Sequence, residues 1–95
     1  MPNDLITLMA GNIFTSLFGG QYDPNYRSQL VDTKSCIEAM VGRRKLPDTP
    51  QTEVFRLRTN ETFSRRALRG DRSRVLRAVS KLIDTRLARL DRQAA

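Results

Sequence analysis

The sequence predicts a small, mainly α-helical single domain with three to four helices and one short extended segment at about residues 52–59. Apolar residues recur at helical spacing near both ends of the 95-residue chain. Glycines and prolines separate these periodic stretches. One segment between them alternates with period two instead. We expect apolar N-terminal helices over 1–44 that make protein contacts, a Pro-containing loop over 45–51, and a basic strand plus helix-turn-helix-like C-terminal helices over 52–95.

The first helix is predicted over residues 4–18, with Asn3 or Asp4 capping its start and Gly19-Gly20 ending it. Its apolar residues cover more than half of its circumference, which indicates burial against more than one neighbour. Whether that neighbour is the same chain or another subunit stays open. The residues expected in such an interface are Leu5, Ile6, Met9, Ile13, Phe14, Leu17 and Phe18.

A second helix is predicted from Asp23-Pro24 to about Val41, because Asp is a good N-cap and Pro fits the first helical position. The helix is expected to break near Asp32-Thr33 if Ser35-x-x-Glu38 serves as a capping box for a new start. Gly42 is expected to end it.

The next segment, residues 52–59, is predicted to be extended. Phe55 and Leu57 alternate there with Arg56 and Arg58, which is the period of a strand. A single strand needs a partner, and no second strand is evident in the sequence. Pairing with another subunit is therefore one expectation, and self-association in general is favoured.

Two helices are predicted to complete the chain. Residues 60–69 form a short helix that Gly70 stops, and Asp71 caps a long amphipathic helix over about 72–92. The apolar face of the long helix spans an arc of roughly 140° at 100° per residue. Arg86 lies on this apolar face, so its guanidinium must reach solvent or find a carboxylate.

The charge of the chain is +7, with a sequence pI near 10.8, and it is concentrated in the C-terminal half. Residues 1–55 carry five basic and six acidic side chains, whereas residues 56–95 carry twelve basic and four acidic ones. Fourteen of the seventeen basic residues are arginine, whose planar fork suits bidentate contacts with phosphate or carboxylate. Such a charge attracts nucleic acid, anionic membranes or acidic proteins.

A stripe of one sign runs along the predicted last helix. Arg74, Arg77 and Lys81 follow one another at i, i+3 and i+7. Asp84 can pair with Lys81, but Arg74 and Arg77 have no obvious acid on the same helix. Like charges at such spacing repel, which indicates an external anion. The candidate nucleic-acid or anion-binding residues are Arg56, Arg58, Arg65, Arg66, Arg72, Arg74, Arg77, Lys81, Arg89 and Arg92.

Several classes of function are not expected. The chain has no histidine and one cysteine, so it lacks the residues of a structural zinc site and of Ser-His or Cys-His catalysis. We expect no enzyme, metal, cofactor or small-molecule substrate. No secretory signal is evident, and the uncharged stretch over 5–20 is too short for a bilayer span. Contact with a membrane is therefore not expected, and a cytoplasmic or particle-bound location is.

Three hypotheses for the function remain. The first is a structural assembly subunit of a larger particle, of the virion, connector or ribonucleoprotein type, in which the Arg-rich region contacts nucleic acid or an acidic neighbour. The second is a small dimeric DNA-binding regulator that reads DNA with its last helix, by analogy with helix-turn-helix proteins. The third is an inhibitor that binds a partner protein through its basic face.

Overall fold

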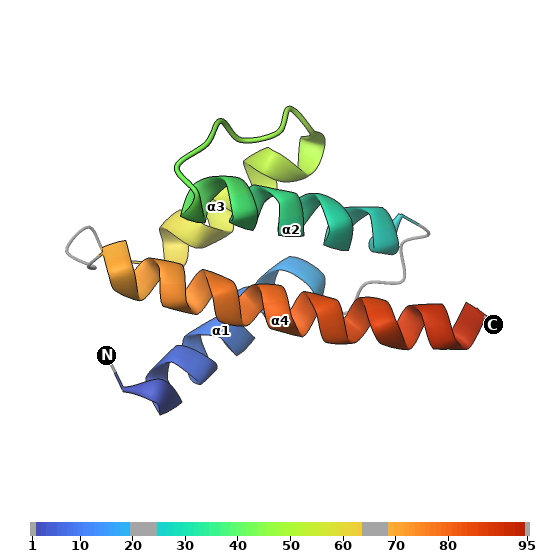
Figure 1. The fold of residues 1–95 in the computed structure, drawn as a ribbon, viewed down its shortest axis with the longest axis horizontal. Coiled ribbons are helices and arrows are strands. Elements are labelled where there is room, and N and C mark those ends of the chain that lie inside the picture. Colours follow the sequence, from blue (N-terminus) through green and yellow to red (C-terminus); the bar gives the residue numbers. More distant parts are fainter. Residues whose placement is uncertain (1, 20–24, 64–68, 95) are drawn as a thin grey trace.

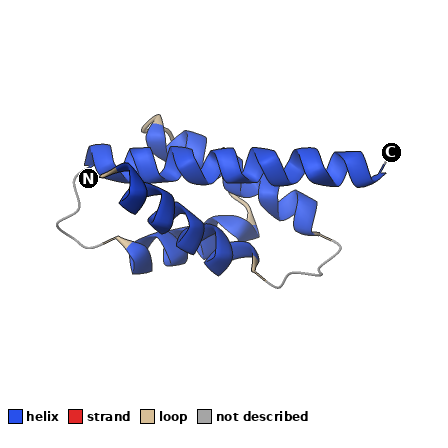
Figure 2. Cartoon of the chain, turned by 90° about the horizontal axis from the view of Figure 1, so that it is seen from below, coloured by secondary structure: helices blue, strands red, loops and turns tan. Residues whose placement is uncertain are grey.

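The computed structural model describes residues 2–19, 25–63 and 69–94, and in these residues it contains four helices and no strand. The helices are α1 (Asn3–Phe18), α2 (Tyr26–Val41), α3 (Pro50–Thr62) and α4 (Arg69–Ala94), and Figure 1 shows them as one bundle. Figure 2 shows the same chain from below, with helix throughout the described elements. The predicted mainly α-helical class is confirmed.

Helix α4 is the organising element of the bundle. It is the longest helix, with 26 residues, and it packs against both α1 and α2. Helix α3 packs against α1 and α2 instead. Helices α2 and α4 run antiparallel, so the C-terminal end of α2 lies beside the N-terminal half of α4 (Figure 1).

All four helices contribute to one hydrophobic core. The side chains of Ile13, Leu30, Phe55 and Ile83, one from each helix, are 0% exposed. The rest of the core is made largely by α1 and α4, which are far apart in the sequence. The N-terminal and C-terminal halves therefore share one core.

The ends of α1 differ in part from the prediction. Helix α1 ends at Phe18, and the N–H of Gly19 donates to the carbonyl oxygen of Thr15. A Cβ at position 19 would lie 2.5 Å from that oxygen, so glycine is needed there. At the start, neither Asn3 nor Asp4 caps the helix: the N-cap position is Pro2, and no side chain bonds to the free N–H groups. The predicted end at Gly19 is confirmed and the predicted cap is wrong.

Helix α2 is continuous from Tyr26 to Val41, so the expected break near Asp32-Thr33 is wrong. Thr33 is fully buried, and its hydroxyl oxygen accepts a hydrogen bond from Nε2 of Gln51 on α3 (3.0 Å). Because this hydroxyl is bonded to another helix, it does not compete for the backbone groups of α2, and the helix continues. Gly42 ends α2 as predicted, and the predicted start at Asp23-Pro24 lies outside the described residues.

The extended segment predicted over 52–59 is wrong, because these residues lie within α3. The helix begins with Pro50 at its first position, where the missing N–H costs no hydrogen bond. Its buried face repeats at helical spacing through Thr52, Phe55 and Thr59, whereas Leu57 is 55% exposed. Two of the buried positions are threonines, so the helical period is hidden when only apolar residues are counted.

The junction before α4 also differs from the prediction. Gly70 and Asp71 lie inside α4 rather than in a turn that separates two helices. Of the short helix predicted over 60–69, residues 60–62 belong to α3, residues 64–68 lie outside the described residues, and Arg69 begins α4. The turn predicted at Gly70 is therefore wrong, and in the described residues the helices with the main contacts to α4 are α1 and α2.

Candidate anion-binding groove

Many of the basic side chains are already engaged by groups of the same chain. Arg27 forms an ion pair with Asp91 (3.0 Å), and Nζ of Lys34 donates a hydrogen bond to Oδ1 of Asp84. Asp84 thus pairs across helices with Lys34 rather than with Lys81 on its own helix. These contacts join α2 to α4 at positions that are seven residues apart on each helix.

Further predicted anion-binding residues are also held within the chain. Arg56 pairs with Glu53 (3.5 Å), and Arg58 pairs with Glu61 (3.2 Å). Exposed pairs of this kind contribute roughly 0–1 kcal/mol each, so they position the side chains more than they stabilise the fold.

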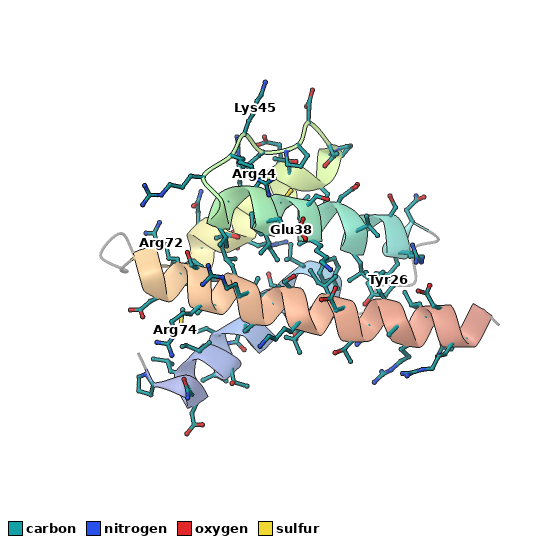
Figure 3. All side chains as sticks on the ribbon, in the orientation of Figure 1. Tyr26, Glu38, Arg44, Lys45, Arg72 and Arg74 are labelled. Carbon is teal, nitrogen blue, oxygen red and sulfur yellow. The ribbon has the colours of Figure 1, made fainter. Side chains whose placement is uncertain are left out.

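The first turns of α4 carry two engaged arginines (Figure 3). Arg72 lies over the ring of Phe63, with 5.8 Å from Cζ to the ring centroid. Arg74 donates to Oδ1 of Asn3 (2.9 Å) and lies 3.9 Å from a carboxylate oxygen of Asp71. Both side chains therefore have roles in joining elements of the fold.

Four more of the predicted residues are exposed on α4: Arg77, Lys81, Arg89 and Arg92. None of them has a carboxylate partner within the part of the chain that the structure describes. The first two lie in the N-terminal half of the helix and the other two in its last turns. Arg65 and Arg66 lie outside the described residues.

A groove between α2 and α4 brings Arg77 and Lys81 together with a third cation, Arg44. It has a volume of about 470 Å³, and the loop after α2 contributes Arg44 to its lining. Arg77 and Lys81 line the same groove from α4, one helical turn apart, with Ser80 beside them. The remaining lining is Ile37, Glu38 and Val41 from α2, and Gly42 directly after it. The groove lining therefore contains three cations, one carboxylate, one hydroxyl and the apolar side chains of Ile37 and Val41.

The end of α2 explains how Arg44 reaches this position. After Gly42, Arg43 takes a left-handed conformation (φ 56°), which is uncommon for a residue other than glycine. This turn brings the N–H of Arg44 to the carbonyl oxygen of Ala39 (2.8 Å). The guanidinium of Arg44 then lies 3.4 Å from the carbonyl oxygen of Glu38. Figure 3 shows Arg44 and Lys45 beside the C-terminal half of α2.

The electrostatics of the α2–α4 boundary change along its length. The hydrogen bond to Asp84 raises the pKa of Lys34 above its usual value of 10.5. Around the groove, in contrast, the lining contains one carboxylate, Glu38, and three cations. The groove therefore has an excess of positive charge and can attract an anion.

Arg86, predicted to need a carboxylate or a route to solvent, is held by aromatic groups. Its Nη1 donates to the hydroxyl oxygen of Tyr26 (3.0 Å), and its Cζ lies 5.5 Å from the ring centroid of Phe14. These contacts keep the cation half-buried between α1, α2 and α4. Arg86 is thereby a structural residue of the bundle.

Most of the residues predicted to form a protein interface are used by the chain's own core. Ile6, Ile13, Leu17 and Phe18 are buried in it, and Met9 and Phe14 are partly buried against it. In this fold these side chains are covered, so the predicted interface does not include the four buried ones. Leu5 is 41% exposed and remains available for contact with another chain.

The sequence-based list of candidate residues included Arg77 and Lys81 but not Arg44. The signal was the run of Arg43, Arg44 and Lys45 directly after a helix-ending glycine. A basic run at that position is also expected to compensate the negative C-terminal end of the helix dipole, so it did not indicate a site. Only the packing of α2 on α4 brings Arg44 to the groove.

The residues that the structure describes include neither a metal cluster nor a membrane span. No three cysteine or acidic side chains lie close enough there to hold a metal ion. No described helix combines the length and the apolar character needed to cross a membrane. No model of a known protein family matches the chain, and no curated protein and no solved structure is significantly similar to it.

Proposed function

We propose that this chain is a non-enzymatic subunit of a larger assembly, and that it contacts the phosphate backbone of nucleic acid through the basic surface around the α2–α4 groove. The observation that carries the proposal is the unequal use of its cations. Arg27, Lys34, Arg56 and Arg58 are paired with carboxylates, whereas the groove has three cations against one carboxylate. A surface that keeps uncompensated arginine and lysine suits phosphate binding, which needs little more than clustered positive charge.

The aromatic residues favour contact with the backbone over contact with bases. Every described aromatic side chain is buried or half-buried, as Phe55 and Phe63 illustrate. Proteins that grip single strands stack bases on exposed aromatic rings. Duplex nucleic acid, or a structured RNA that presents its phosphates, is therefore the better fit to this surface.

Exposed apolar side chains support the assembly part of the proposal. Leu8 is 60% exposed on α1, and Leu57 is 55% exposed on α3. Single exposed leucines are common on monomers, so these side chains carry less weight in the proposal than the basic groove. Neighbouring subunits would cover these side chains in a particle of the virion, connector or ribonucleoprotein type.

The sequence-reading regulator is less well supported. That hypothesis needs a helix-turn-helix pair that presents α4 to the major groove. In the described residues α4 packs on α1 and α2, and Arg74 contacts Asn3. A regulator predicts that Arg74→Ala relaxes sequence preference, whereas a phosphate-binding surface predicts an equal change in affinity for all sequences.

The proposal is tested by fluorescence anisotropy of a labelled random duplex, titrated with the protein from low to physiological salt. Log affinity should fall linearly with log salt, with a slope of about −0.9 for each phosphate contact. Light scattering of the purified protein should detect self-association, and purification from native extracts should recover other subunits. Absence of duplex binding at low salt would refute the nucleic-acid contact, and the basic surface would then fit the acidic partner of an inhibitor protein.

A further inference from the structure

The contacts between α2 and α4 follow a regular spacing that ends at the groove. Arg27 pairs with Asp91, and Lys34 pairs with Asp84. Because the helices are antiparallel, seven residues forward on α2 correspond to seven residues backward on α4. The next position in this series is Val41 opposite Arg77, and both residues line the groove. At this third position the α4 residue is the cation Arg77 and the α2 residue is Val41, so the series offers Arg77 no acid.

Two more cations gather where the series of ion pairs ends. Lys81 lies one turn after Arg77 on the same face of α4, and Arg44 approaches from the loop after α2. Half-buried Ser80, which lies between Arg77 and Lys81 in the sequence, also lines the groove. Donors from two separate elements thus surround a concave space of about 470 Å³.

We infer that this groove is a binding site for a phosphate group, held by Arg44, Arg77 and Lys81 with the Ser80 hydroxyl as a neutral donor. The inference rests on the proposed function and specifies the site at which it acts. A tetrahedral anion offers oxygens in several directions, so it can accept from donors on both sides of a groove. Guanidinium groups bind phosphate oxygens with two parallel hydrogen bonds, and the ammonium group adds a point charge.

Removal of the Glu38 charge should strengthen phosphate binding, whereas removal of a groove cation should weaken it. Its carboxylate is exposed and lines the groove with the three cations, so it competes with an incoming anion. Glu38→Gln removes that competition at nearly constant shape and should tighten phosphate binding severalfold. Ser80→Glu places a second carboxylate beside Arg77 and should abolish binding at the site, because the side chain occupies the position of the ligand.

The test uses the full chain and two probes, a labelled duplex followed by anisotropy and inorganic phosphate followed by backbone amide NMR shifts at constant ionic strength. Arg77→Gln with Lys81→Gln should weaken duplex binding about tenfold or more and reduce the salt slope by about 1.8. The matched control is Arg89→Gln with Arg92→Gln, which removes the same charge from the exposed C-terminal end of α4. Circular dichroism checks that each variant keeps its helix content.

The outcomes separate this site from the proposed function. Equal losses in the groove pair and the control pair, with duplex binding intact in the parent protein, would overturn the site and leave the function standing. Phosphate shifts centred on Gly42, Arg77 and Ser80 without any duplex binding would support the site, identify a free phosphate or a headgroup as its source, and overturn the nucleic-acid function. Tighter binding of polyglutamate than of duplex at equal salt would overturn phosphate in favour of an acidic protein.

Discussion

Replacement of Phe55 by alanine should destabilise the protein far more than replacement of Leu57, two residues further along α3. Phe55 is 0% exposed and packs in the common core, whereas Leu57 is 55% exposed. Truncation of a fully buried Phe to Ala typically costs about 3–5 kcal/mol, through lost transfer free energy and the cavity that remains. Truncation of a half-exposed side chain away from the core changes stability by about 0.5 kcal/mol or less.

These magnitudes can be compared with the total stability of the chain. A 95-residue domain is expected to have an unfolding free energy of roughly 5–14 kcal/mol. Loss of about 4 kcal/mol at a urea slope of about 1.5 kcal/mol per M moves the unfolding midpoint by about 2–3 M. Phe55→Leu, which retains part of the apolar volume, gives a smaller shift and keeps the measurement accessible if the alanine variant does not fold.

The assay is urea unfolding followed by circular dichroism at 222 nm, with Leu57→Ala as the matched control. A strand over this segment would place Phe55 and Leu57 on the same face, and the two substitutions would then have similar effects. A helix places them about 200° apart, so their effects differ by several kcal/mol. Similar midpoints for the two alanine variants would refute the helical packing of α3 described above.

Three further outcomes follow from single contacts. Thr33→Val should cost about 1–3 kcal/mol in urea unfolding, because it leaves buried Gln51 without its acceptor; an unchanged midpoint would show that the amide finds another partner. Lys34, whose pKa is raised by Asp84, stabilises the fold below its usual pKa of 10.5, and this contribution disappears as pH rises through its higher folded pKa. The thermal midpoint should therefore fall more steeply above about pH 10.5 in the parent than in Lys34→Arg, whose charge persists; parallel curves would contradict the ion pair. Arg43→Gly should raise stability by about 0.5–1 kcal/mol by relieving the left-handed φ of 56°, whereas Arg43→Ala should not.

Much of the fold was predictable where the pattern is local. The helices over 4–18 and 72–92 agree with α1 and α4, since apolar residues at helical spacing determine which face is buried. The segment over 52–59 was not predictable in the same way. Its buried positions include Thr52 and Thr59. Because threonine is not counted as apolar, the helical spacing of the buried face does not appear in the apolar pattern. Short alternating stretches are ambiguous for that reason.

The candidate site, too, was predictable from the sequence only in part. The sequence by itself determined that positive charge concentrates after residue 55 and that Arg77 and Lys81 share one helical face. Tertiary structure decided which cations keep their charge uncompensated. Asp84 pairs with Lys34, fifty residues away, and leaves Lys81 to the groove. Ion pairing depends on the distance between charges in space, and the antiparallel packing of α2 on α4 sets those distances. The residue spacing within one helix therefore does not predict these pairs.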